Sequence, residues 1–115
     1  MSDGYLGLGL GAGYDNTHDS SILNQMHNQG MIEDKIFGVH TKPTNSTEDP
    51  SSIRFGGYNA DLFKEGHDQV WLRTKSPSTW NVEFENVKFG GSKNVWDKGT
   101  ALIDPGFPLI GVPHT

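Results

Sequence analysis

The 115-residue chain contains no cysteine, no cluster of basic residues and no long apolar run. Without cysteine, disulfides, thiolate metal sites and a cysteine nucleophile are excluded, although the cellular compartment stays open. Nine Lys and Arg residues against 14 Asp and Glu residues give a net charge of −5. Because phosphate binding needs a basic patch, we expect no nucleic-acid partner. No segment approaches the roughly 18 apolar residues of a membrane-spanning helix, so no membrane span is expected.

The sequence is also poor in core-forming residues. Hydrophobic residues make up 33% and glycine occurs 15 times, which predicts a thin core, many turns and marginal stability unless a partner covers apolar surface. Three Trp, three Tyr and six Phe nevertheless argue against a disordered chain. The first residues lack the basic region of a signal peptide and glycines interrupt their apolar stretch, so we expect no signal peptide there and the predicted localisation is unknown.

Most of the periodic segments predict strands. A Gly-rich strand is expected over residues 5–13, followed by a helix that Ser20 or Ser21 caps and that ends at Gln29 before a glycine. Further short strands are expected at residues 35–40, 53–55 and 70–73. Irregular structure is expected over residues 58–66.

The clearest alternation is in residues 80–84, where Trp, Val and Phe alternate with Asn and Glu, as in a half-buried strand. Asn86 is expected to begin a turn into residues 87–89, which Gly90 and Gly91 then close or continue. Residues 101–103 form a wholly apolar run, as in a short buried strand. The predicted fold class is mainly β with one short helix.

Asp104 is the strongest candidate for a catalytic residue. It directly follows the apolar run and precedes Pro105 and Gly106, so we expect its carboxyl on a tight, poorly solvated loop. Burial and a second carboxylate raise the pKa of such a group, and the pair can share a proton and activate water. The alternative is an ordinary Asp-Pro-Gly turn, with proline and glycine at favoured turn positions.

Other site hypotheses find less support. Gly7, Gly9 and Ala12 loosely fit a dinucleotide-binding fingerprint, but the required preceding strand is too short and the following residues are loop-like. No Gly-x-Ser-x-Gly nucleophile elbow occurs. No two histidines are closely spaced, so surface positions are favoured over a zinc site; they are His18, His27, His40, His67 and His114. We therefore predict no cofactor and no metal.

Five phrases, in this order and spacing, resemble the middle of a pepsin-like aspartic peptidase. They are Asp-Gly-Tyr-Leu-Gly-Leu-Gly at 3–9, the segment 23–36, Ile-Arg-Phe-Gly-Gly-Tyr at 53–58, Trp-Asn-Val-Glu-Phe at 80–84, and Ala-Leu-Ile-Asp-Pro-Gly-Phe-Pro-Leu-Ile at 101–110. In that family, two β lobes each contribute one catalytic aspartate to a cleft that binds peptide. The resemblance implies partial pepsin-like β-barrel lobes: residues 1–18 as the end of the first lobe, and residues 19–115 as the interlobe segment and an incomplete second lobe.

Carried over residue by residue, the resemblance makes Asp104 the one candidate catalytic aspartate. The family has Thr after this aspartate and Thr or Ser after the glycine, whereas this sequence has Pro105 and Phe107. Because proline has neither an N–H nor a hydroxyl, the groups that support the carboxylate in the family are missing. Asp104 is therefore expected to be a degenerate remnant, and the first lobe's aspartate would lie before residue 1.

Three functions follow as hypotheses, and the sequence does not decide whether the chain is an enzyme. It is either an aspartic-peptidase-like protein that is inactive in isolation, a non-catalytic structural or interaction subunit of a larger complex, or a fragment without function. The expected partners are a peptide or protein substrate if the site is active, and another protein chain that completes or covers the incomplete lobes.

Overall fold

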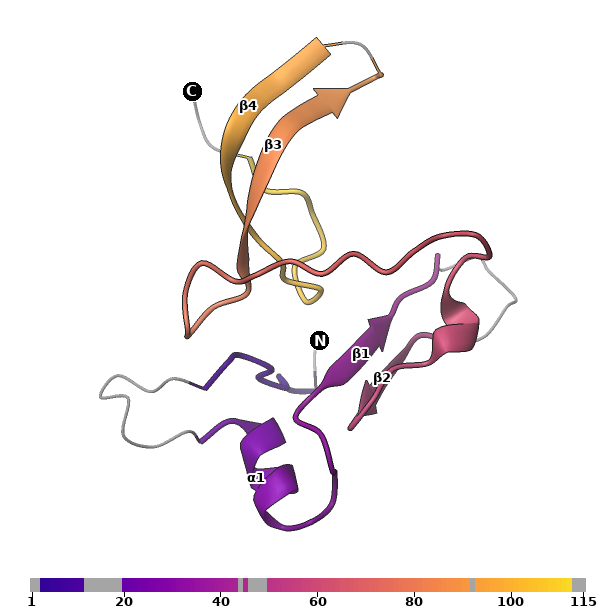
Figure 1. Cartoon of the computed structure of the whole chain (residues 1–115), viewed down its shortest axis with the longest axis vertical. Helices are drawn as coiled ribbons and strands as arrows, with labels where there is room; N and C mark the ends of the chain where they lie inside the picture. Colours follow the sequence, from indigo (N-terminus) through magenta and orange to yellow (C-terminus); the bar gives the residue numbers. More distant parts are fainter. Residues whose placement is uncertain (1–2, 12–19, 44, 46–49, 92, 113–115) are drawn as a thin grey trace. The chain divides into compact units, whose positions relative to one another are not determined.

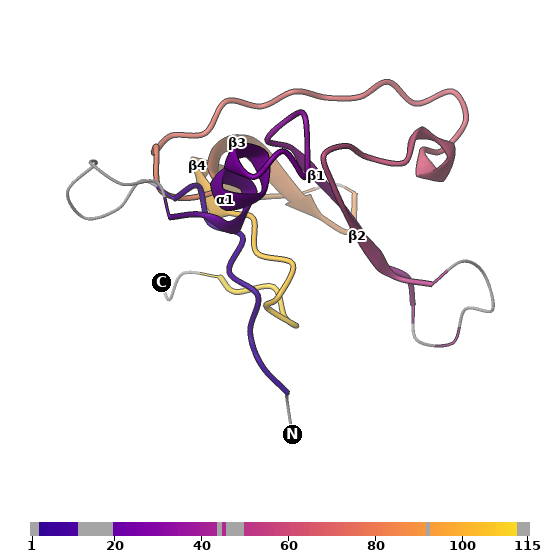
Figure 2. The same cartoon turned by 90° about the horizontal axis from the view of Figure 1, so that it is seen from below.

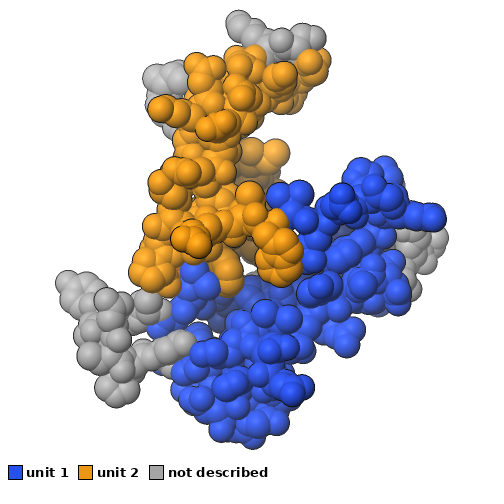
Figure 3. All heavy atoms as spheres, in the orientation of Figure 1, with its two compact units in different colours: residues 1–70 blue, residues 71–115 orange. Residues whose placement is uncertain are grey.

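The computed structural model describes residues 3–11, 20–43, 45, 50–91 and 93–112. These described residues form four strands, one short α-helix and one 3₁₀ turn (Figure 1). The chain divides into two compact units, residues 1–70 and 71–115 (Figure 3), which are described separately. The predicted lobe boundary near residue 18 lies outside the described residues.

The helix α1 (Ile22–Asn28) begins at a serine cap. Ser21 places its Oγ 3.3 Å from the backbone nitrogen of Asn24 and accepts that N–H, which satisfies one of the donors that a helix start leaves unpaired. Leu23 is 8% exposed and is the one buried hydrophobic side chain of the described residues. The predicted cap is confirmed, and the helix ends at Asn28 with Gln29 as its C-cap, one residue before the predicted end.

Glycine ends this helix. Gly30 has φ +69°, a backbone conformation that costs glycine little. Its N–H donates to the carbonyl of His27 at 2.9 Å, while the N–H of Met31 donates to the carbonyl of Met26 at 2.9 Å. These two bonds form the Schellman pattern and pair carbonyls that the helix end would otherwise leave free.

Strands β1 (Phe37–His40) and β2 (Ser52–Phe55) pair antiparallel, with the first residue of β1 opposite the last residue of β2. Both views show them side by side (Figures 1 and 2). Gly56 ends β2 with φ +72°, and its N–H donates to the carbonyl of Ile36 at 2.9 Å. A Cβ built on Gly56 would lie 3.0 Å from Cγ2 of Ile32, so glycine serves both the turn and the packing here.

A 3₁₀ turn, η1 (Ala60–Leu62), follows β2. The side chain of Asn59 caps it and accepts the N–H of Asp61 at 3.2 Å. The rings of Tyr58 and Phe63 stack across it with centroids 5.5 Å apart. The sequence predicted irregular structure in this segment, and the structure adds this single turn.

Two predicted strands are wrong. The described part of the Gly-rich segment, residues 3–11, contains no strand, and residues 70–73 form none either. Trp71 is 77% exposed. Among the described residues, neither segment belongs to a paired strand, and β propensity alone does not make a strand without a partner.

In the second unit, β3 (Asn81–Phe89) and β4 (Lys93–Leu102) form a long antiparallel hairpin. Gly90 and Gly91 turn the chain with φ +64° and +84°. The strand that the alternation predicted is confirmed. The turn predicted at Asn86 is wrong, because β3 runs through this residue with a local φ of +55°.

The predicted buried strand at 101–103 is corrected in two respects. Its first two residues are the end of the longer β4, and Leu102 is 60% exposed. Among the described residues, β3 and β4 pair only with each other. A two-stranded ribbon cannot bury both of its faces.

The fold is thus mainly β with one short α-helix, as predicted. The described strands form two separate two-stranded sheets and no closed barrel, which agrees with a partial pepsin-like β fold. In the parts of the chain that the structure describes, no helix is long and apolar enough to span a membrane.

Candidate functional site

The strand that precedes Asp104 continues one step beyond β4. The N–H of Ile103 donates to the carbonyl of Trp80 at 3.0 Å, so residue 103 is still held by the chain that leads into β3. Asp104 is therefore the first residue that the hairpin leaves unpaired. Its position on a loop directly after a paired segment agrees with the sequence analysis.

Asp104 begins a tight turn. The N–H of Phe107 donates to the carbonyl of Asp104 at 3.1 Å, which closes a four-residue β-turn with Pro105 at its second position. Gly106 is not among the positive-φ glycines of the described residues, so this is not the type II turn that needs a positive φ there. Proline's fixed φ suits the second position of the turn.

The carboxylate of Asp104 bonds to its own turn. Its Oδ1 accepts the N–H of Gly106 at 3.0 Å, an Asx-turn in which the side chain mimics a backbone acceptor. The residue is exposed, so the expected poorly solvated environment is wrong for this structure. The residue before it, Ile103, is exposed as well.

The geometry has a chemical consequence. An acid–base dyad requires a second carboxylate within hydrogen-bond reach, about 2.6–3.2 Å, and surroundings that keep one proton between the pair. The structure provides a solvated carboxylate that accepts a hydrogen bond from a neighbouring backbone amide. By itself, this arrangement stabilises a turn.

The remaining candidates are not brought together. His27 lies in the last turn of α1 and His40 ends β1, while His18 and His114 lie outside the described residues. Among the described residues, no three His, Cys, Asp or Glu side chains form a group that could hold a metal ion. The dinucleotide hypothesis loses its required strand, because none is present in residues 3–11.

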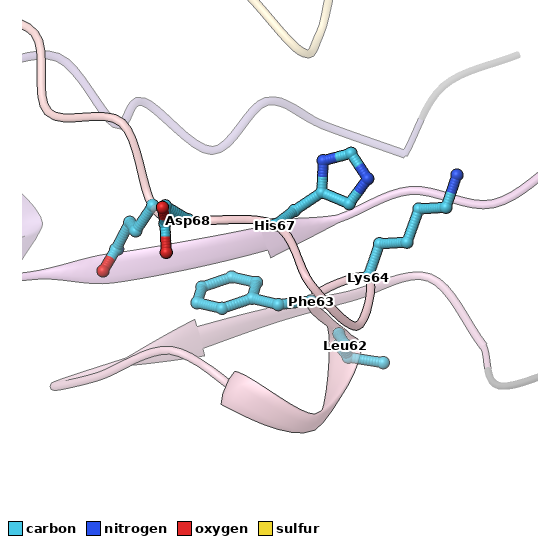
Figure 4. A pocket seen from close by; sticks show the side chains of 6 residues that line it. Leu62, Phe63, Lys64, His67 and Asp68 are labelled. Atoms are coloured by element: carbon cyan, nitrogen blue, oxygen red, sulfur yellow. The ribbon is translucent and has the colours of Figure 1, made fainter.

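One hollow was not foreseen from the sequence. It has a volume of ≈ 230 Å³, and Figure 4 shows Lys64 and His67 directed to the same side, away from Phe63. The lining residues are Leu62, Phe63, Lys64, His67, Asp68 and Gln69. Asn59, which caps η1, is the feature of the sequence that could have indicated a compact turn here. The mixed charges of the lining define no reaction.

Comparison with known proteins identifies the family. The family model described as eukaryotic aspartyl protease matches residues 1–115. The chain therefore belongs to the eukaryotic aspartyl protease family, and the resemblance found in the sequence is confirmed.

Individual relatives give the same result. The chain is 33% identical over 98% of its length to a vacuolar aspartic protease of Candida albicans, and it covers 26% of that protein. It is 28% identical over 98% of its length to vacuolar protease A of Aspergillus fumigatus, of which it covers 28%. Rhizopuspepsin-1 of Rhizopus niveus is 30% identical over 96% of the chain. The chain thus spans about a quarter of the length of these relatives.

Proposed function

We propose that these 115 residues are a non-catalytic part of an aspartyl protease fold. Residues 1–18 correspond to the end of the first lobe, and residues 19–115 to the interlobe segment and part of the second lobe. The family match over the whole chain and the order of the five matching phrases support this assignment. Peptide hydrolysis by an aspartate dyad is the activity of the family, and these residues do not perform it alone.

One observation carries the proposal. The Asp104 carboxylate accepts the N–H of Gly106 at 3.0 Å while exposed to solvent. Pro105 occupies the position at which the family has Thr, and it offers the carboxylate neither a hydroxyl nor an amide N–H. Supporting hydrogen bonds hold catalytic groups in productive geometry. Here the hydrogen bond to the Asp104 carboxylate comes from the backbone of its own turn.

The first experiment measures proteolysis by the purified chain. An acid-denatured protein substrate is incubated with the chain between pH 2 and pH 6. A pair of catalytic carboxylates is expected to share one proton in roughly this acidic range. We expect no cleavage beyond that of the Asp104→Asn variant. Cleavage that pepstatin inhibits and that Asp104→Asn abolishes would overturn the proposal.

A chimera tests the loop itself. The matching quarter of the Candida albicans vacuolar aspartic protease is replaced by this chain, so that the remaining residues come from the relative. We expect kcat/KM to fall by at least about 100-fold, the cost of misplacing a reacting group by roughly 1 Å. The double change Pro105→Thr and Phe107→Thr should recover part of that loss, and Pro105→Ala should not. An unmodified chimera with full activity contradicts the proposed degeneracy.

Exposed apolar side chains favour a second candidate function, an interaction module that pairs with another protein chain. Phe89 is 84% exposed, and Trp71 is exposed to a similar degree. Large apolar patches on a protein surface often mark sites that bind another protein, and open strand edges add to the tendency to associate. A well-folded monomer in light scattering at all accessible concentrations would remove this candidate.

The route through the cell is part of the proposal. Relatives of the chain are named as vacuolar proteases, and one that is 32% identical over 89% of the chain is a secreted aspartic protease of Candida albicans. We propose that this protein likewise passes through the secretory pathway. Fractionation of cells that produce the tagged natural gene product tests this, and recovery only with cytosolic markers contradicts it.

A further inference from the structure

We propose that Asn45 is an acceptor for an N-linked oligosaccharide. Asn45 precedes Ser46 and Thr47, which makes the Asn-x-Ser/Thr pattern that the glycosylating enzyme recognises. The chain has seven asparagines besides Asn45, and only Asn45 has a hydroxyl residue two positions later. A single modified position is therefore expected.

The local structure makes Asn45 accessible. It is exposed and lies in a turn between β1 and β2. Ser46 and Thr47 lie outside the described residues and contribute here by their identity alone. A glycan acceptor must be reached by a large enzyme, so an exposed connection is the expected place for it.

The loop is also separated from the paired strands. The last pair of the β1–β2 ribbon joins His40 to Ser52. Beyond it, the N–H of Lys42 donates to Oγ of Ser51 at 3.1 Å and closes the base of the loop. Because Asn45 lies beyond this closure, a bulky substituent on its side chain disturbs no strand pairing.

The chemistry is a group transfer from a lipid-linked donor. The side-chain amide nitrogen of Asn45 attacks the anomeric carbon of an oligosaccharide attached through pyrophosphate to a polyisoprenoid lipid. A C–N bond forms, the C–O bond to the lipid pyrophosphate breaks, and the lipid pyrophosphate leaves with the electron pair. The amide nitrogen loses one proton, so atoms and charges balance. Thr47 supplies the hydroxyl that the enzyme requires.

This inference rests on the proposed secretory route, and the test separates the two. The full chain is fused to a cleavable signal sequence and translated in the presence of endoplasmic-reticulum microsomes, which deliver it to the lumen whatever its natural route. Glycosylation is measured as an electrophoretic shift that an endoglycosidase removes. The variants Asn45→Gln and Thr47→Ala remove the amide and the hydroxyl respectively.

A second acceptor serves as the matched positive control. Gly90→Asn creates an Asn-Gly-Ser sequence on the β3–β4 turn, where φ is +64° and a Cβ meets nothing within 4 Å. Asparagine tolerates such a left-handed conformation. Glycosylation of the Asn45→Gln, Gly90→Asn double variant shows that the chain has reached the lumen and can be modified there.

We expect one shift for the unmodified sequence, none for Asn45→Gln or Thr47→Ala, and one for the Asn45→Gln, Gly90→Asn double variant. Modification of the double variant without modification of the unmodified sequence overturns the proposal. Equal modification of Asn45→Gln and the unmodified sequence overturns it as well, since the glycan then lies elsewhere.

Discussion

The aromatic ring of Phe84 lies against Gly99, its partner on the neighbouring strand. A Cβ built on Gly99 would be 2.6 Å from Cζ of this ring and 3.0 Å from its Cε1. Real side chains do not approach so closely, so glycine is required for the ring to occupy this place. A glycine inside a strand often marks such a close approach, and an aromatic residue across the pair covers it.

Gly99→Ala is the first test of this contact. We expect it to lower the free energy of unfolding by about 1–3 kcal/mol, the usual cost of overpacking, measured as a lower urea midpoint by tryptophan fluorescence. In a Phe84→Ala background the added methyl group meets no ring, and its cost should largely disappear. Equal costs in the two backgrounds would show that the ring does not set this requirement.

Alanine substitutions at Gly56 and Gly66 distinguish the cost of packing from the cost of backbone strain. Both have positive φ, +72° and +77°, but a Cβ on Gly56 would lie 3.0 Å from Ile32 whereas one on Gly66 meets nothing within 4 Å. Alanine at either position costs about 1–3 kcal/mol for the left-handed conformation. We expect Gly56→Ala to cost more in denaturant unfolding, because it also displaces the isoleucine. A larger cost for Gly66→Ala contradicts this explanation.

Ser21→Ala tests the helix cap. The Ser21 hydroxyl accepts the N–H of Asn24 at 3.3 Å, and loss of such a cap typically costs about 1 kcal/mol. Hydrogen exchange of the Asn24 amide should become faster by about fivefold. Ser20→Ala, one position earlier and outside the cap, should leave this rate unchanged, and similar acceleration in both variants would count against the assigned cap.

Asn86 combines a left-handed backbone with a side-chain bond. Its Oδ1 accepts an N–H from the side-chain Nδ2 of Asn94 at 3.2 Å, and its φ is +55°. Asn86→Gly removes the bond but suits the backbone, whereas Asn86→Ala removes the bond and adds strain of about 1 kcal/mol or more. Alanine should therefore lower the urea midpoint more than glycine does. The reverse order would contradict a backbone origin of the effect.

The elements with strong local signals were predicted well. The serine cap and the glycine after the last turn define α1, and alternation of apolar and polar residues predicts the start of β3. Asn86 misled the sequence analysis because a left-handed asparagine usually marks a turn. In the structure the pairing with β4 continues on both sides of it, so tertiary hydrogen bonds override the local preference.

The sequence predicted the local turn at Asp104 but not its solvent exposure, and whether Asp104 is a site residue stays a prediction. Sequence located Asp104 on a tight loop after an apolar strand, and the Asp-Pro-Gly turn that it offered as the alternative matches the observed hydrogen bonds. Solvation could not be predicted, because it depends on which layers cover the strand. Burial is a property of packing between distant segments, and no local pattern reports it.

The amino-acid sequence by itself determined the family, the short helix, the main strand and the lone acid between an apolar run and a proline. Only the tertiary structure decided that the apolar runs stay uncovered, that the hairpin extends through Asn86, and that the Asp104 carboxylate turns back to the amide of Gly106. The physical reason is the range of the interactions. Caps, turns and alternation act over a few residues, whereas burial and strand pairing depend on segments that meet only in the fold.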